Sequence, residues 1–244
     1  MQGSAQTISP LRIVPRSGLC DACQVRGVAA CSALDNNELQ RLASIVTEKK
    51  YDAGATIFEQ GDEPAYIFNL TSGHVRLAKT LANGRRQIIG FVYPGGMLGL
   101  ATHGAYVCSA EAIGPVKLCR FPRDRLLALL DELPPLKTRL LDIAADELGD
   151  AQEQMLLLGR KTPLERVASF LWRQYQEAIR CGQTKPSIDL PMGRTDIADY
   201  LGTTIETVSR TFTRLRNDGL IRLEHANKVI ILDAQGLEEI AEGL

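Results

Sequence analysis

The chain has 244 residues, of which 45% are hydrophobic and 23% are charged, and its formal net charge is -1. This composition is typical of a soluble globular protein with one large or two modest domains, and it excludes a chain that is basic overall. No run of about 18 apolar residues is present and the N-terminus lacks the apolar core of a signal peptide, so we expect a cytoplasmic protein with no membrane partner.

Half of the six cysteines fall in one stretch near the N-terminus, CDACQVRGVAAC, which holds Cys20, Cys23 and Cys31. In a reducing compartment, clustered cysteines are more often metal, cluster or redox ligands than disulfides. An iron–sulfur cluster needs four soft anionic ligands, and zinc uses the same thiolates. The candidates for the fourth ligand are Cys108, Cys119 and Cys181, and spacing does not choose among them. We therefore predict a cysteine-rich, cluster-binding segment over residues 1–33.

Residues 34–133 have the pattern of a β-roll domain preceded by a short helix. Asp35 and Glu38 have capping-box spacing, and an apolar stripe follows them. From residue 50 to residue 121, short apolar segments alternate with glycine turns about every ten residues, and Asn83-Gly84 is a strong hairpin signal. The pattern predicts an all-β barrel or sandwich.

A long helix is predicted over residues 135–159, within a dimerisation segment over 134–160, because Pro134-Pro135 suits its start and Gly159 its end. Apolar residues recur along it at spacings of three and four, as in a coiled-coil seam. The seam residues are Leu141, Ala144, Leu148, Ala151, Met155 and Leu158. The alternative is that this face packs on the chain's own β domain; we favour a homodimer.

Residues 161–244 have the pattern of a winged helix-turn-helix. Thr162 and Glu165 have capping-box spacing at the start of a further helix. In GRTDIADYLGTTIETVSRTFTRLRNDGLI, a short helix over 195–201 precedes Gly202, and a second helix runs from about residue 205 to 217. LIRLE and VIILD, separated by a turn, predict the two strands of a wing. The fold class predicted for the whole chain is α+β.

The second helix places polar side chains on one face, where they can read base edges in the major groove. The base-reading candidates are Glu206, Ser209, Arg210, Thr213 and Arg214, and Arg216 is placed for a phosphate. Residues 160–228 hold 12 Lys and Arg against 8 Asp and Glu, so a polyanion would meet this region. The alternative for Glu206 is a capping role with Thr203, three residues before it.

Enzymatic signatures are absent from the sequence. Phosphate-binding-loop, nucleophile-elbow and H-E-x-x-H patterns are missing, and the three histidines have no spacing typical of zinc ligation or triads. We therefore predict a DNA-binding regulator rather than an enzyme.

These features resemble the regulators related to the cyclic-AMP receptor protein. They resemble most its oxygen-sensing iron–sulfur branch, the FNR regulators and the nitrogen-fixation regulators of α-proteobacteria. The likeness covers nearly the whole chain, in CDACQVRGVAAC, the glycine-punctuated strands, LCRFP, MLLLGRKTPLERVASFL and YLGTTIETVSR.

The resemblance implies a [4Fe–4S] cofactor held by Cys20, Cys23, Cys31 and Cys119, the last chosen over Cys108 because it matches the family position. It implies a palindromic site of the TTGAT-N4-ATCAA type, because Glu206, Thr207, Ser209 and Arg210 match the family's E-T-x-S-R. Cyclic nucleotide is not expected as a ligand, because the matching positions Cys108-Ser109 and Gly99-Leu100 lack the family's arginine and glutamate. RNA polymerase is an implied partner through the Leu81–Gln87 turn, whose charges could equally be a solvated hairpin.

The combined prediction is a transcription activator whose cluster, intact under low oxygen, favours the DNA-binding dimer. Oxygen, or nitric oxide, would release the bias by degrading the cluster. Two alternatives use the same scaffold: a zinc- or thiol-switched regulator, and a regulator whose β-roll accepts a small ligand.

Overall fold

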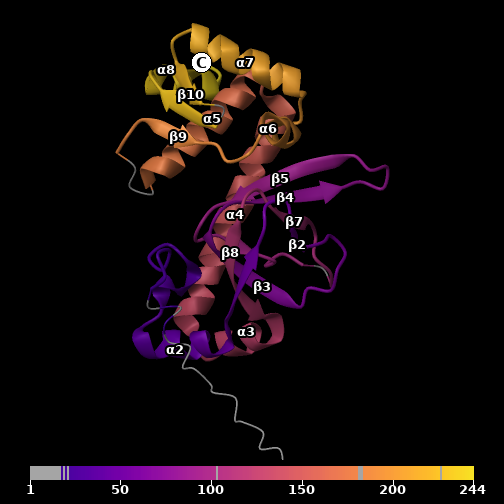
Figure 1. Cartoon of the computed structure of the whole chain (residues 1–244), viewed down its shortest axis with the longest axis vertical. Coiled ribbons are helices and arrows are strands. Elements are labelled where there is room, and N and C mark those ends of the chain that lie inside the picture. Colours follow the sequence, from indigo (N-terminus) through magenta and orange to yellow (C-terminus); the bar gives the residue numbers. More distant parts are fainter. Residues whose placement is uncertain (1–17, 19, 21, 103, 181–183, 226) are drawn as a thin grey trace, which may run out of the picture.

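The structure is a computed structural model that describes residues 18, 20, 22–102, 104–180, 184–225 and 227–244. A β-roll domain and a C-terminal domain are connected by one long helix, α4, which runs along the length of the molecule (Figure 1). The α+β class predicted from the sequence is confirmed. Within the described ranges, none of the helices combines the length and apolar character needed to cross a membrane.

The β-roll domain begins with the 3-10 helix η1 (Ala30–Ala33) and the helix α2 (Asn36–Ile45). The predicted capping box is present at the start of α2. The Glu38 amide donates to Asp35 Oδ1 at 2.8 Å, and the Asp35 amide donates to Glu38 Oε2 at 3.0 Å. This reciprocal cap fixes where the helix begins.

Two four-stranded antiparallel sheets form the roll, with strand orders β1-β8-β3-β6 and β2-β7-β4-β5. The strands are β1 (Thr47–Tyr51), β2 (Thr56–Phe58), β3 (Tyr66–Ser72), β4 (Val75–Thr80), β5 (Arg86–Val92), β6 (Met97–Leu98), β7 (Ser109–Ala112) and β8 (Val116–Pro122). The predicted Asn83-Gly84 turn joins β4 to β5, and Gly84 has a φ of 80° that glycine adopts without strain.

Three helices follow the roll. They are α3 (Arg123–Leu130), α4 (Pro134–Arg160) and α5 (Pro163–Arg180). The helix predicted over 135–159 is thus confirmed within one residue at each end. The predicted cap of α5 is also present: the Thr162 amide donates to Glu165 Oε2 at 2.7 Å, and the Glu165 amide donates to Thr162 Oγ1 at 3.4 Å.

The C-terminal domain is a winged helix-turn-helix. Its elements after α5 are β9 (Ser187–Asp189), α6 (Arg194–Leu201), α7 (Ile205–Asn217), β10 (Ile221–His225), β11 (Lys228–Ile231) and α8 (Ala234–Glu242). The two wing strands predicted from the sequence are confirmed as β10 and β11. The sheet has a third strand, β9, which sequence analysis missed because three residues are too few to show alternation.

The two domains share a core. Phe170, Leu201 and Phe212 from the C-terminal domain belong to the same buried cluster as Ala78 of β4 and Ile88 of β5. The β4–β5 hairpin is therefore packed against the helix-turn-helix unit, as its place beside α6 in Figure 1 shows. Local sequence patterns did not predict this contact.

Candidate metal centre and DNA-binding surface

Four cysteines line one cavity in the β-roll domain. Cys20, Cys23 and Cys31 come from the N-terminal segment, and Cys119 comes from β8 almost ninety residues later. The rest of the lining is Leu42, Val46, Asn69 and Phe121, from α2 and its C-terminal end, β3 and β8. The arrangement gives four soft sulfur ligands in a half-buried, largely apolar site.

Strand register turns Cys119 toward this cavity. Cys119 lies opposite Asn69 across the β3–β8 pair, and both residues line the cavity. Its neighbour Leu118 points the other way, into the core between the two sheets, and is fully buried. Successive side chains of a strand alternate between its two faces, so Leu118 of β8 points into the core and Cys119 points into the cysteine cavity.

Short-range turns shape the N-terminal segment around its cysteines. The Cys23 amide donates to the Cys20 carbonyl at 3.4 Å, and the Arg26 amide donates to the Cys23 carbonyl at 3.3 Å. The segment rests on the turn before β6 through Val28: a Cβ added at Gly95, whose φ is +97°, would come within 2.7 Å of Val28 Cγ2. Glycine is required there for both the conformation and the contact.

Burial and repulsion from the neighbouring cysteines favour the neutral thiol at Cys31 and at Cys119. Burial, followed by the nearby Cys23 and Cys20, raises the pKa of the Cys31 thiol to about 11. Burial, followed by the other three cysteines, raises the pKa of Cys119 to about 12. Four thiolates in this cavity therefore need a cationic partner, such as a metal centre, to compensate their charge.

Of the other two candidate ligands, only Cys108 lies within the described residues, and it does not line this cavity. Cys108 is 8% exposed and packs with Phe58 and Tyr106 in the core between the two sheets. Cys181 lies outside the described residues. Across the described ranges, no three or more His, Cys, Asp and Glu side chains are arranged to hold a single metal ion.

The cysteine cavity is in contact with the long helix. The 3-10 helix η1 carries Cys31 and packs on α4. Ala30 of η1 and Leu34 just after it share one apolar cluster with Leu136, Leu140 and Ile143 of α4. The N-terminal segment is therefore in direct packing contact with the first half of α4.

The predicted seam residues lie mostly on the exposed side of α4. Leu141, Leu148 and Met155 are 66%, 60% and 64% exposed, and Ala144 and Ala151 are also exposed. Leu158 differs, because it is half-buried and packs against the core of the C-terminal domain.

The helix-turn-helix has the geometry expected from its sequence. Ala198 and Val208 are buried between α6 and α7, and Gly202 ends α6 in the left-handed conformation with a φ of 58°. Thr204 caps α7 by accepting from the Thr207 amide at 3.2 Å. The alternative that Glu206 forms a capping box with Thr203 is therefore wrong, because the helix begins one residue later.

The polar face of α7 is open to solvent. Its inner face buries Val208, Thr211, Phe212 and Leu215, while all six DNA-binding candidates are exposed: Glu206, Ser209, Arg210, Thr213, Arg214 and Arg216. Hydrogen bonds to its own backbone and to Thr204 lower the pKa of Glu206, so this side chain is a carboxylate that can accept a hydrogen bond from a base.

Arg166 of α5 joins α4 to the helix-turn-helix. Its guanidinium donates to the carbonyl oxygens of Leu158 at 2.8 Å, Lys161 at 2.9 Å and Leu201 at 3.0 Å. These carbonyls lie at the C-terminal ends of α4 and α6, where a cation is favourable. Sequence analysis missed Arg166, because no local pattern marks an arginine that bridges separate helix ends.

The interior of the β-roll is filled by aromatic side chains. Phe58 and Tyr106 stack with ring centroids 4.0 Å apart, and the Tyr106 hydroxyl donates to the Tyr66 carbonyl at 2.7 Å. Tyr106 also packs against Gly99, where a Cβ would approach the ring to 3.0 Å.

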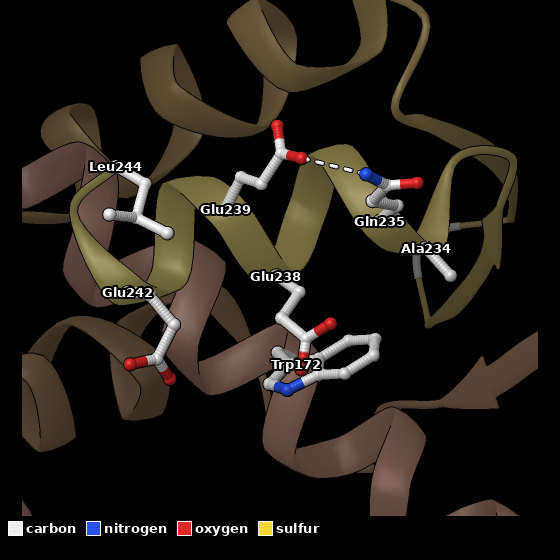
Figure 2. A pocket seen from close by; sticks show the side chains of 7 residues that line it. All are labelled: Trp172, Ala234, Gln235, Glu238, Glu239, Glu242 and Leu244. Atoms are coloured by element: carbon white, nitrogen blue, oxygen red, sulfur yellow. Dashed lines mark hydrogen bonds between the residues drawn. The ribbon is translucent and has the colours of Figure 1, made fainter.

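An open groove of about 540 Å³ lies between α5 and α8, on the C-terminal domain. Figure 2 shows Glu238 beside Trp172 in this groove and Glu242 farther along the same helix, with Glu239 hydrogen-bonded to Gln235. Its carboxylates repel a polyanion such as DNA.

Comparison with known proteins gives concordant matches to both domains. The family model of the Crp-like helix-turn-helix domain matches residues 165–240, and that of the cyclic nucleotide-binding domain matches residues 48–132. Nitrogen fixation regulation protein FixK of Bradyrhizobium diazoefficiens is 40% identical over 235 residues, which cover 96% of this chain and 98% of that protein. Transcriptional activator protein FnrL of Cereibacter sphaeroides is 36% identical, covering 91% of this chain and 92% of that protein. The solved structure of FixK2 from Bradyrhizobium japonicum superposes with a TM-score of 0.75 at 34% identity, covering 80% of this chain and 97% of that one.

Proposed function

The chain belongs to the CRP/FNR family of transcription regulators, and we propose that it is an oxygen-responsive activator whose DNA-binding homodimer is controlled by a [4Fe–4S] cluster. The relatives are transcription regulators, so the chain is a DNA-binding regulator and not an enzyme.

The observation that carries the cluster proposal is the cavity shared by Cys20, Cys23, Cys31 and Cys119. Four thiolates are the donor set of a [4Fe–4S] cluster. When bound, such a cluster supplies an iron–thiolate bond to each cysteine and a centre that oxygen oxidises. The raised pKa values of Cys31 and Cys119 mean that cluster binding must displace protons, and the iron charge compensates the thiolates in their place.

Zinc is the alternative metal, because it binds the same four thiolates with Zn–S bonds of about 2.3 Å. Acid-labile sulfide separates the two, because an iron–sulfur cluster contains it and a zinc site does not.

The contact between η1 and α4 connects the cysteines to the proposed dimer helix. Cys31 lies on η1, and its neighbours Ala30 and Leu34 share an apolar cluster with Leu136 of α4. If the four cysteines held a cluster, they would tie the N-terminal segment to β8 and order this contact, which would favour the dimer. Converting a 1:99 mixture of monomer-like and dimer-like states to 99:1 takes about 5.5 kcal/mol, which is within the range that metal–thiolate ligation supplies.

The homodimer forms through the exposed stripe of α4 that contains Leu141, Leu148 and Met155. Each subunit then places one α7 against one half of a palindromic TTGAT-N4-ATCAA site. Arg210, Glu206 and Ser209 read base edges there, and Arg216 contacts a phosphate.

The β4–β5 turn is the proposed contact for RNA polymerase. Leu81 to Arg85 at its tip are exposed, whereas Arg86 pairs with Asp196 and Gln87 donates to the Asp199 carbonyl, both in the C-terminal domain. A cyclic nucleotide is not a ligand in this proposal, because Tyr106 fills the roll and the positions Gly99-Leu100 and Cys108-Ser109 supply neither carboxylate nor cation.

Anaerobic purification tests the cluster. We expect about four iron and four acid-labile sulfide per chain with a visible charge-transfer band. Cys119→Ala is expected to abolish both, while Cys108→Ala, the matched control from the neighbouring core, is expected to keep them. Zinc without sulfide in the wild type, or cluster loss in Cys108→Ala alone, contradicts the proposal.

A further inference from the structure

An ion-pair network connects the β-roll to the first helix of the helix-turn-helix. Its four members are Arg76 of β4, Arg86 of β5, Glu111 of β7 and Asp196 of α6. Arg76 Nη2 lies 2.7 Å from Glu111 Oε2, and Arg76 Nη1 lies 3.0 Å from Asp196 Oδ1. Arg86 contacts the same two carboxylates, with its Nη1 3.2 Å from Glu111 Oε2 and its Nη2 3.6 Å from Asp196 Oδ1.

The network differs from the ion pairs on the surface. The Asp196 side chain is only 13% exposed and that of Arg76 is 23% exposed, whereas the two side chains of the Arg214–Asp218 pair are 64% and 50% exposed. Solvent screening is weaker for partly buried pairs, and removing one partner leaves a desolvated charge without compensation. Asp196 is therefore held in place by charge as well as by packing.

Other contacts at this junction act on the last turn of α6. Gln87 Nε2, in the side-chain amide, donates to the Asp199 carbonyl at 2.5 Å and to the Tyr200 carbonyl at 3.4 Å. Phe91 of β5 packs against Tyr200 with ring centroids 5.3 Å apart. Polar contacts thus hold both ends of α6 on the β4–β5 hairpin, which fixes its direction and, through the buried α6–α7 contact, the direction of the recognition helix.

We propose that the Arg76–Arg86–Glu111–Asp196 network is an orientation lock, which docks the helix-turn-helix unit on its own β-roll in the DNA-binding arrangement. Docking places two guanidinium groups against two carboxylates. Undocking leaves both arginines with Glu111 alone and exposes Asp196 unpaired. Arg76 and Arg86 are therefore matched by two carboxylates only when α6 is in place.

The lock matters because a dimer must present two recognition helices at a fixed separation, about 34 Å for adjacent major grooves. A helix-turn-helix unit that is free to rotate loses this orientational freedom on binding, which lowers its affinity. The inference rests on the DNA binding proposed above but is independent of the cluster. It predicts that residues outside the DNA-binding domain control affinity without touching DNA.

Arg76→Gln, Asp196→Asn and the double variant form the test in the full-length protein. The probe is a duplex that carries TTGAT-N4-ATCAA. Each single variant is expected to bind it roughly tenfold more weakly, and the double variant no more weakly than either single one, because both remove the same contact. Glu238→Gln removes one charge from the same domain at a distance from the network and is expected to bind within about twofold of wild type.

Hydrogen exchange of the α6 backbone amides gives a readout that does not depend on DNA. Both single variants are expected to exchange faster in α6 while the β3–β8 amides remain protected. Unchanged α6 exchange in Arg76→Gln overturns the proposal, and so do additive effects on binding. If the wild type fails to bind the duplex, the proposed DNA site is wrong, while the exchange measurement still decides whether the lock exists.

Discussion

Leu148→Ala tests the dimer seam at its centre. Leu148 is 60% exposed in the single chain, so the greater part of its surface is available for burial by a second copy. Fully burying a leucine contributes about 1.5–3 kcal/mol, and the exposed share corresponds to about 1–2 kcal/mol per side chain. A symmetric dimer contains two copies of Leu148, so the substitution removes about 2–4 kcal/mol of dimerisation free energy in total. Because about 1.4 kcal/mol changes an equilibrium constant tenfold, we expect the dimer dissociation constant to rise at least roughly 30-fold.

Sedimentation equilibrium of anaerobic protein measures this constant. Leu232→Ala is the matched control, because Leu232 is a leucine of similar exposure, 52%, that follows β11 and lies away from α4. It is expected to leave the dissociation constant unchanged. Leu158→Ala is expected to act differently, lowering the free energy of unfolding by about 1–2 kcal/mol, because Leu158 packs within its own chain.

A dissociation constant for Leu148→Ala within about threefold of wild type would contradict a dimer contact at Leu148. The same conclusion would follow if Leu232→Ala weakened the dimer as much as Leu148→Ala does. In the first case, α4 packs on some other surface, and the apolar spacing along it has a different cause.

Three other changes have specific expected outcomes. Arg210→Ala is expected to reduce the free-energy preference for the correct base at one position of each half-site by about 1–3 kcal/mol. The measurement is binding to duplexes that carry single base-pair substitutions in each half-site. An unchanged preference contradicts the assignment of α7 as the recognition helix. Gly95→Ala is expected to loosen the cysteine segment at a cost of about 1–3 kcal/mol, because the added Cβ meets Val28 at 2.7 Å and φ is +97°; limited proteolysis that matches wild type argues against the contact. Burial lowers the pKa of His74 below its usual 6.5, so the unfolded chain binds a proton at a higher pH than the folded chain does, and the free energy of unfolding decreases as the pH falls below about 6.5. In His74→Gln, urea unfolding is expected to show a smaller decrease over that range. A pH dependence identical to that of wild type would assign the decrease to other groups.

The helices and turns were predictable because their signals are local. The capping boxes at Asp35 and Thr162, the Asn83-Gly84 turn and the glycine between the two helices of the helix-turn-helix each lie within a few residues of the element they define. Their hydrogen bonds join residues that are close in sequence, so the sequence alone specifies them. Strand β9 was missed because pairing with β11, rather than its own three residues, makes it a strand.

Spacing along the sequence left the partner of the N-terminal cysteines open among three candidates, and the resemblance to known regulators pointed to one of them. The structure places Cys119 beside Cys20, Cys23 and Cys31 and places Cys108 in a separate core. The difference between these two cysteines depends on strand register, because a shift of one residue turns a side chain to the opposite face of a sheet.

By itself, the sequence of this protein determined the long helix, the two helices of the helix-turn-helix, the glycine turns and the cysteine motif, because each depends on periodicity or on neighbouring residues. Only the tertiary structure decided that η1 packs on α4, that Arg166 joins two helix ends, and that Asp196 pairs with Arg76 120 residues earlier. These contacts depend on how helices and strands pack against one another after they form. The chain contains many arginine and aspartate side chains that could form such a pair, and the strand register and the packing of the sheets decide which of them meet.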